Sequence, residues 1–305
     1  MRTIDAGLGA ISHLAFRPAG SLLAAAGDAG IGVALWPALA EGRGPFDTIS
    51  LNESERVGQH AWHPQGRFFA TAGLSELGPV QLRDHRLRLQ QEFLALSGQE
   101  GPMVAIAFSP DGSRLAFAGG FWGEPSRVVV VPTAKWRPSE TVGSHANQIG
   151  AILFSGSNVL VTGSADRSVA VLGLDDPADD GPRIIVPLPV QALALRSDGA
   201  QLAVGTGNFV QLHRVGRDGR PSPDDPLICR GHKAVVKAAA FAADGRTLAS
   251  VGDDAVLRLW DAATGAERVA LALGLGGLRT VAFSPDGLTV VAAGVAGMVA
   301  IVDSE

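Results

Sequence analysis

The sequence is poor in the residues that commonly stabilise small secreted or metal-binding proteins. It has one cysteine, Cys229, no tyrosine and three methionines in 305 residues. A single cysteine cannot form an intrachain disulfide or supply a cysteine-based metal cluster. A disulfide-stabilised secreted scaffold is therefore excluded, and a reducing compartment, the cytoplasm, is expected.

Charge and long apolar runs are also scarce. Charged residues make up 18% of the chain and the formal net charge is −5, whereas a nucleic-acid surface needs a basic excess or stripe. The densest basic stretch is Arg83, Arg86 and Arg88 with Asp84 among them, which is typical of a solvated loop. Charges or Gly/Pro turns interrupt every apolar run, and MRTIDAGLGA lacks the pattern of a signal peptide. We therefore expect a monomer on its own, with no nucleic-acid or membrane partner.

What the sequence has instead is a repeat. A bulky residue ends an apolar run, and a short turn rich in Pro, Asp and Gly follows, as in the SPDG after Phe108. The bulky residues are Phe16, Trp62, Phe108, Phe154, Leu195, Phe241 and Phe283. Their successive spacings are 46, 46, 46, 41, 46 and 42 residues. This is the period of a four-stranded propeller blade.

The recurring turn residues have distinct conformational roles. Pro presets φ, Asp can bond its own backbone, and Gly accepts the left-handed conformation that ends a hairpin loop. The turn after Phe154, SGSN, departs from this pattern because Asn158 takes the place of Gly. Asn is the next best residue for a positive φ. We therefore expect the same turn there.

Each turn is followed by a second and a third apolar run and by a more variable fourth segment, as in 159–173 and 183–188. The runs are near-continuous, as expected for strands covered on both faces by neighbouring sheets. No stretch combines an N-cap signal with helical spacing. The sequence therefore predicts an all-β fold of seven four-stranded antiparallel blades, one β-propeller domain over residues 1–305.

The two chain ends complement each other. The seventh repeat ends with MVAIVDSE and holds only three strands, while the segment Arg2–Ala6 precedes the first inner strand without another partner. An open array would leave exposed strand edges at both ends. We therefore expect the N-terminal segment to pair with the last blade and close the ring.

The stretch Gly231–Asp261 is the best-kept copy of the repeat, with Gly231-His232 at its start and Trp260-Asp261 at its end. Most copies also have an SPDG-like turn between their first two strands. With these features the sequence resembles the WD-repeat family of β-propellers over almost the whole chain. The resemblance implies a structural tetrad of His232, Ser250, Asp254 and Trp260.

The other repeats keep less of this tetrad. The fourth retains Ser144-His145, Thr162 and Asp166 but has Leu172 in place of Trp. The fifth retains none of it. The resemblance therefore implies a diverged member with a partial network in the fourth blade.

Three groups of residues invite a chemical interpretation. Ser250, His232 and Asp254 have the residue types of a hydrolytic triad, but such a serine needs an exposed position on a strained turn. Ser250 falls inside an apolar run, which favours a buried hydrogen-bond network.

His60 and His63 suggest metal ligands, but no third ligand lies nearby, and residues three apart on a strand point to opposite faces. Asp175, Asp176, Asp179 and Asp180 lack the ordered spacing of a calcium loop. Strand-end histidines and a solvated acidic loop are the favoured interpretations, and no cofactor is expected.

The loop GGFWGEPS of the third repeat is longer than a tight turn and contains Phe121 and Trp122, and the second-repeat loop GLSELGP offers Leu74 and Leu77. In a propeller both loops lie on one face, and exposed aromatic anchors are enriched at interaction hot spots. We therefore predict a non-enzymatic scaffold that binds one or more proteins there. The expected polar contacts come from the following residues: Glu53, Arg56, His145 and Asn147.

The competing interpretation is a propeller enzyme, a metal-assisted hydrolase or lactonase at the mouth of the central channel. Such an enzyme needs carboxylates or histidines that converge on the axis. The candidates are few and scattered: His13, Arg56, Glu100, Asn147 and Arg279.

Overall fold

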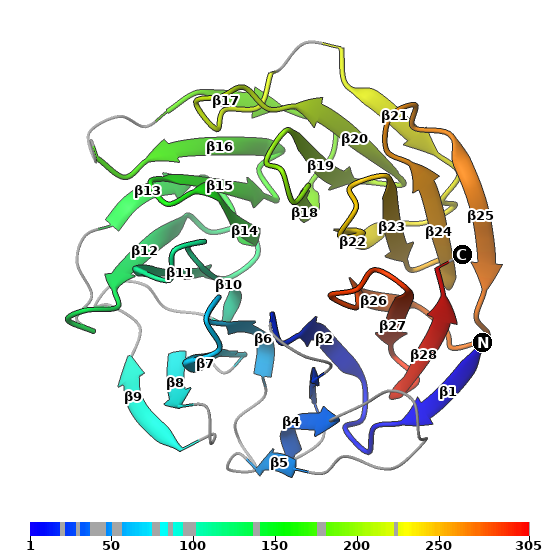
Figure 1. Cartoon of the computed structure of the whole chain (residues 1–305). Coiled ribbons are helices and arrows are strands. Elements are labelled where there is room, and N and C mark those ends of the chain that lie inside the picture. Colours follow the sequence, from blue (N-terminus) through cyan, green and yellow to red (C-terminus); the bar gives the residue numbers. More distant parts are fainter. Residues whose placement is uncertain are drawn as a thin grey trace.

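The computed structural model describes residues 1–18, 22–28, 31–36, 47–50, 57–74, 80–84, 88–93, 102–136, 141–175, 181–222 and 225–304. In these ranges the regular structure is β-strand, and they contain no helix that could span a membrane. The strands form seven four-stranded antiparallel sheets arranged in a ring (Figure 1). The predicted all-β, seven-bladed propeller is confirmed.

Each blade has four strands, and the blades are numbered 1 to 7 in the order of their inner strands. The inner strands are β2 (Ile11–Phe16), β6 (Val57–Trp62), β10 (Met103–Phe108), β14 (Ile149–Gly156), β18 (Val190–Leu195), β22 (Val236–Phe241) and β26 (Leu278–Phe283). The second strands are β3 (Leu23–Gly27), β7 (Phe68–Gly73), β11 (Arg114–Gly119), β15 (Val159–Ser164), β19 (Gln201–Thr206), β23 (Thr247–Gly252) and β27 (Thr289–Gly294).

The third strands are β4 (Ile31–Trp36), β8 (Val80–Asp84), β12 (Ser126–Pro132), β16 (Ser168–Gly173), β20 (Phe209–Arg214), β24 (Val256–Asp261) and β28 (Met298–Asp303). The outer strands are β5 (Asp47–Ser50), β9 (Leu89–Phe93), β13 (Thr141–His145), β17 (Arg183–Ile185), β21 (Leu227–Arg230), β25 (Glu267–Ala272) and, in blade 7, β1 (Arg2–Asp5).

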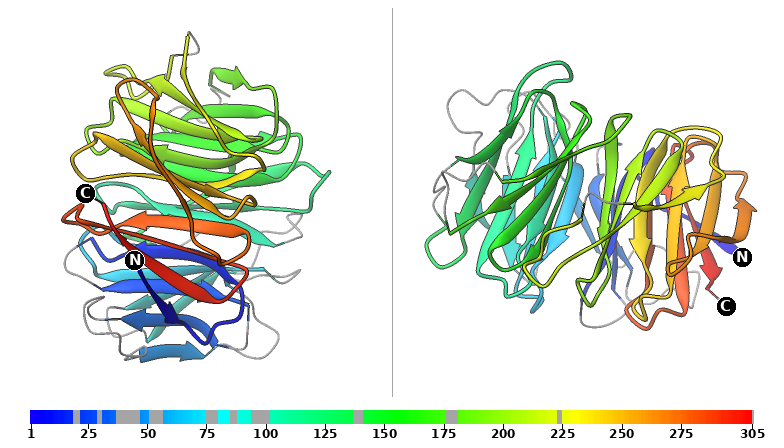
Figure 2. Two further views of the ribbon diagram at one scale, coloured as in Figure 1. Left: turned by 90° about the vertical axis from the view of Figure 1, so that its right-hand side faces the viewer. Right: turned by 90° about the horizontal axis from the view of Figure 1, so that it is seen from above.

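The ring closes through its two ends, as predicted. β1 pairs antiparallel with β28, with Arg2 opposite Ile301 and Asp5 opposite Met298. Figure 2 shows the two ends of the chain next to each other at the edge of the ring. Blade 7 therefore combines three C-terminal strands with one N-terminal strand. β1 covers the edge of β28 that would otherwise lack a partner strand.

The core consists of apolar layers between neighbouring blades. One layer joins Leu212 and Cys229 of blade 5 to Val236, Leu248 and Trp260 of blade 6, all fully or almost fully buried. The other interblade layers of the described residues follow the same plan. Both faces of most blades are thus covered, which explains the near-continuous apolar runs of the sequence.

Every inner strand carries a β-bulge at its second residue. In blade 1, Ile11 pairs with Gly27 and His13 with Ala26, so no residue of β3 lies directly opposite Ser12 in the strand pairing. The same irregularity recurs in the other six blades. A bulge re-aims the side chain of the extra residue. The bulge residues in blade order are Ser12, Gly58, Val104, Gly150, Gln191, Lys237 and Arg279.

The expectation of a positive φ at Asn158 is wrong. β14 continues past Phe154 to Gly156, which pairs with Val159, so only Ser157 and Asn158 close this hairpin. Asn158 is not among the described residues with a positive φ, whereas Gly112, in the matching turn of blade 3, has φ of 72°. The longer inner strand thus leaves a two-residue turn in which Asn158 does not adopt the left-handed conformation.

His63 directly follows the end of β6, as predicted, and also links two blades. Its ring is buried, its Nε2 lies 3.2 Å from the carbonyl oxygen of Gly112 in blade 3, and its Nδ1 accepts a hydrogen bond from the Gln65 amide at 3.1 Å. These contacts fix the tautomer with the proton on Nε2. Burial lowers the pKa of His63, so the ring is a neutral interblade link.

Candidate functional site

The two faces of the ring carry different loops. Met103, at the start of β10, lies opposite Gly119, at the end of β11, and the other blades have the same register. Loops before inner strands and loops between second and third strands therefore share one face, which we name the start face. The opposite face carries the Pro-, Asp- and Gly-rich turns, and we name it the turn face.

Phe121 and Trp122 lie on the start face but differ in exposure. Phe121 is half-buried, whereas 61% of the surface of Trp122 is exposed. A large exposed aromatic side chain loses apolar contact with water when a partner covers it, which makes it a favourable anchor. Of the predicted pair, Trp122 is the residue that can meet a partner.

The loop that carries Trp122 is held in place by blade 4. The Oδ1 atom of Asn147 accepts a hydrogen bond from the Gly123 amide at 2.7 Å, and the Nε2 atom of Gln148 donates to the Gly120 carbonyl at 2.6 Å. The hydroxyl of Ser126 donates to the carbonyl of Gly119 within the loop base. Asn147 thus positions the anchor, and a preformed loop reduces the ordering cost of binding.

The start face also exposes apolar residues that the sequence interpretation missed. Leu188, Val235 and Val295 are 42%, 37% and 47% exposed and belong to the loops of blades 5, 6 and 7. Each stands beside an apolar run and so looks like part of a strand in the sequence. A Gly or Pro directly next to the run was the available signal only for Leu188 and Val295.

The remaining predicted contact residues have mixed outcomes. Leu74 lies on the start face and is half-buried, with its side chain packed against the backbone of Gly58. Leu77, Glu53 and Arg56 lie outside the described residues.

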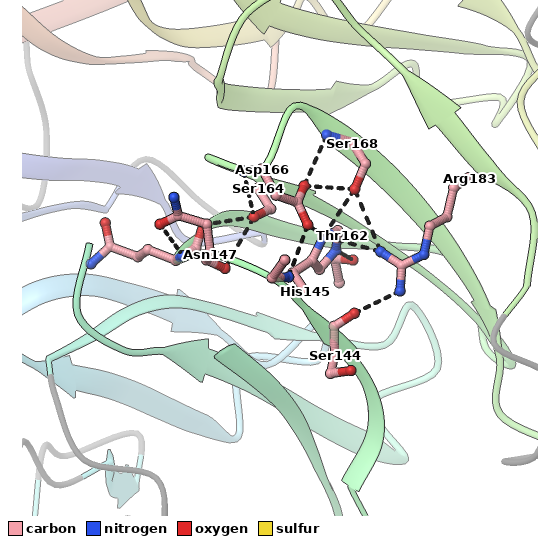
Figure 3. A network of polar contacts seen from close by, with 10 residues as sticks. Ser144, His145, Asn147, Thr162, Ser164, Asp166, Ser168 and Arg183 are labelled. Carbon is pink, nitrogen blue, oxygen red and sulfur yellow. Dashed lines mark hydrogen bonds and ion pairs between the residues drawn. The ribbon is translucent and has the colours of Figure 1, made fainter. Parts of the chain in front are cut away.

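His145, predicted as a polar contact, is instead buried inside a hydrogen-bond network (Figure 3). Its Nδ1 lies 3.0 Å from Oδ2 of Asp166 and its Nε2 lies 2.8 Å from Oγ1 of Thr162. The network joins the end of β13 in blade 3 to blade 4. His145 therefore holds two blades together and does not face a partner.

Polar residues extend this network in the blade that has Leu172 in place of Trp. The hydroxyl of Ser168 lies 2.7 Å from Asp166 Oδ1, and Nη2 of Arg183 donates to the carbonyl of Ser144 at 2.7 Å. Burial alone would raise the pKa of Asp166, but hydrogen bonds from Ser168 and His145 hold it below its usual range. Arg183 belongs to a variable outer strand, so the sequence pattern did not reveal its role.

The tetrad residues of blade 6 form a continuous chain of hydrogen bonds. His232 Nδ1 lies 3.0 Å from Asp254, His232 Nε2 lies 2.8 Å from Ser250 Oγ, and Trp260 Nε1 donates to Ser250 Oγ at 2.8 Å. The hydroxyl of Ser250 accepts from Trp260, so its own proton is directed to His232. Ser250 is fully buried. A hydroxyl enclosed in this way cannot meet a substrate, so the arrangement is structural.

The inner strands enclose an axial cavity of about 180 Å³. Its lining includes His13 and Arg279, two of the candidates for an enzymatic site, but not Asn147. Arg56 and Glu100 lie outside the described residues. Among the described residues no group of His, Cys, Asp and Glu is placed to hold a metal ion.

A histidine pair between blades 1 and 2 was not foreseen. Nδ1 of His13 and Nδ1 of His60 are 3.3 Å apart, and the two rings meet edge to face with centroids 4.5 Å apart. Burial lowers the pKa of His13 to about 4, and burial together with His13 lowers the pKa of His60. Both rings are therefore neutral near pH 7, and one Nδ1–H donates to the other ring.

The comparison with protein families matches the blade that holds the tetrad. The model described as "WD domain, G-beta repeat" matches residues 225–261, from before His232 to Asp261. The other blades repeat the strand order of this blade around the ring. Residues 225–261 therefore match a WD repeat, and the seven-bladed ring together with this match supports a WD-repeat family protein.

Relatives of this chain include an uncharacterized WD repeat-containing protein of Synechocystis sp., 41% identical over 96 residues, or 31% of this chain. Human WD repeat-containing protein 90 is 24% identical over 245 residues, 72% of this chain. Telomerase protein component 1 of Rattus norvegicus is 28% identical over 205 residues, 65% of this chain. The matches span 26%, 13% and 8% of the lengths of these proteins.

Proposed function

We propose that this WD-repeat propeller is a non-enzymatic scaffold that binds a protein partner on its start face, with Trp122 as an anchor. The observation that carries the proposal is the high exposure of Trp122 on a loop that Asn147 and Gln148 hold in one conformation. Binding to such a loop needs little reordering, so most of the apolar contact contributes to affinity. The match to a WD repeat supports an interaction role in general. Cytoplasmic localisation stays a prediction from the composition.

The test compares two truncations of exposed apolar side chains on opposite faces. Trp122→Ala removes the proposed anchor, and Leu288→Ala removes a residue that is 55% exposed on the turn face. Surface substitutions of this kind change stability by about 0.5 kcal/mol or less, so both variants should fold.

The three proteins, tagged and purified, are used for affinity capture from a lysate of the source organism, followed by mass spectrometry. Wild type and Leu288→Ala are expected to capture the same proteins, and Trp122→Ala is expected to lose them. Capture of the same proteins by all three would refute the start face as the binding surface.

A further inference from the structure

Three consecutive blades direct long polar side chains into the axial cavity at the start face. The bulge residues of blades 5, 6 and 7 are Gln191, Lys237 and Arg279, and all three line the cavity. The bulge residues of blades 1 to 4 are Ser12, Gly58, Val104 and Gly150. The bulge positions of blades 5 to 7 therefore carry long hydrogen-bond donors, whereas those of blades 1 to 4 carry shorter side chains or none.

The charge of this mouth is positive and only partly neutralised. Lys237 forms an ion pair with Asp253 at 3.3 Å, whereas the exposed guanidinium of Arg279 has no hydrogen-bond or ion-pair partner among the described residues. The residues that line the cavity include no Asp or Glu. Low-dielectric walls focus the field of such cations and raise the local concentration of anions.

The cavities of the turn face differ, because their charges pair with each other. Arg196 contacts both carboxylate oxygens of Asp198 at 2.8 Å, and Arg268 forms an ion pair with Asp261. These four residues line a single cavity of about 380 Å³. Arg246 and Asp244 also line it, so three carboxylates balance its three cations, and the axial mouth is the better site for an added anion.

Each of the same three blades also exposes one apolar residue on the start face, near the bulge residue that lines the axial cavity. Leu188 accompanies Gln191 in blade 5, Val235 accompanies Lys237 in blade 6, and Val295 accompanies Arg279 in blade 7. Leu188 and Val235 lie just before β18 and β22, and Val295 lies just after β27, so each is on the start face of its blade.

The loops that carry two of these apolar residues are fixed by backbone hydrogen bonds. The Asp253 amide donates to the Val235 carbonyl at 3.0 Å, and the Val295 amide donates to the Gly277 carbonyl at 3.1 Å. A Cβ at Gly252 would lie 2.3 Å from the Val235 carbonyl oxygen, so this glycine is needed for the close approach. The apolar rim is therefore preformed around the cationic mouth.

From this juxtaposition we propose that the start face binds a segment of a partner protein in which an Asp or Glu is flanked by apolar residues. The acidic side chain enters the axial mouth and pairs with Arg279, and the flanking side chains cover the rim formed by Leu188, Val235 and Val295. This proposal rests on the proposed function and adds the chemistry of the partner.

The test is a selection of random linear peptides displayed on phage against wild type, Arg279→Gln and Arg246→Gln. Arg246 is an exposed arginine of the turn face, so its substitution is a matched control for charge. Circular dichroism and the melting temperature verify that each variant is folded. Peptides from wild type and Arg246→Gln are expected to be enriched in an Asp or Glu at one position between apolar residues. Peptides from Arg279→Gln are expected to lack this enrichment.

A double-mutant cycle then measures the contact in one selected peptide. Replacing its acidic residue by the amide should weaken binding to wild type about tenfold, as expected for a partly desolvated charge pair. The same replacement should have no effect on binding to Arg279→Gln. An equal loss with both proteins would overturn the pairing with Arg279.

Other outcomes separate this proposal from the proposed function. Selected peptides that require Trp122 but show no acidic preference would overturn the acidic segment and leave the start face as the binding surface. Peptides that bind Trp122→Ala and Arg279→Gln as well as wild type, or a selection that enriches no peptide, would count against both proposals.

Discussion

Acidification is expected to destabilise the ring through the histidine pair between blades 1 and 2. Desolvation of the partly buried ring lowers the pKa of His13 to about 4 in the folded chain, against about 6.5 in an unfolded chain. Between these values the unfolded chain binds more protons than the folded one, so stability falls as pH falls. Protonation of the accepting ring would also place a second N–H on the short contact between His13 and His60 and break the hydrogen bond.

The magnitude follows from the shift of His13. Each pKa unit corresponds to about 1.4 kcal/mol, and proton linkage between pH 7.5 and pH 5 then gives a loss of about 2 kcal/mol for His13 alone. The lowered pKa of His60 adds to this loss in the same direction. A loss of this size is a substantial part of the stability of a typical domain.

The assay is urea unfolding followed by tryptophan fluorescence at pH 7.5 and pH 5, with wild type, the double variant His13→Leu/His60→Leu, and His213→Gln as a control. The double variant lacks both titrating rings and is expected to lose at least about 2 kcal/mol less than wild type on acidification. The control retains the histidine pair and is expected to show the loss of stability on acidification that the pair causes. An equal pH-dependent loss in wild type and the double variant would refute the assignment.

Two further predictions concern ring closure and the tetrad. Deletion of residues 1–6 removes β1 and exposes the edge of β28, so the melting temperature is expected to fall; an unchanged value would show that closure contributes no stability. Ser250→Ala leaves the Trp260 N–H and a ring nitrogen of His232 buried without a partner and should cost about 2–3 kcal/mol. Thr162→Val in blade 4 leaves only a ring nitrogen unpaired and should cost less. Denaturant unfolding measures both, and an equal cost would contradict this role of Trp260.

The strands and the closure of the ring could be predicted because their signals are local or lie at fixed spacing. The turn after Phe108 and the three-strand end of the chain are visible without knowing what contacts what. The prediction of a positive φ at Asn158 was wrong because the pairing of β14 with β15 extends to Gly156, which the turn residues do not reveal.

The contacts between blades could not be read in the same way. His13 and His60 are 47 positions apart, and only the packing of β2 beside β6 brings them together. Arg183 supports the network around His145 from an outer strand whose sequence varies between blades. The difference in exposure between Phe121 and Trp122 depends on which side of the loop faces the blade. Two adjacent aromatic residues in a sequence do not indicate which of them is exposed.

The repeated bulge separates the chemistry of the pore from the stability of the ring. Because the extra residue of each inner strand lies outside the regular pairing, its side chain can change while the neighbouring hydrogen bonds stay in place. Ser12, Gln191, Lys237 and Arg279 are the bulge residues that line the axial cavity, and substitutions there can change its charge from cationic to neutral or anionic while the strand pairing stays the same. A lineage that kept this strand pairing could acquire new binding preferences through single substitutions on the axis, without repacking any blade.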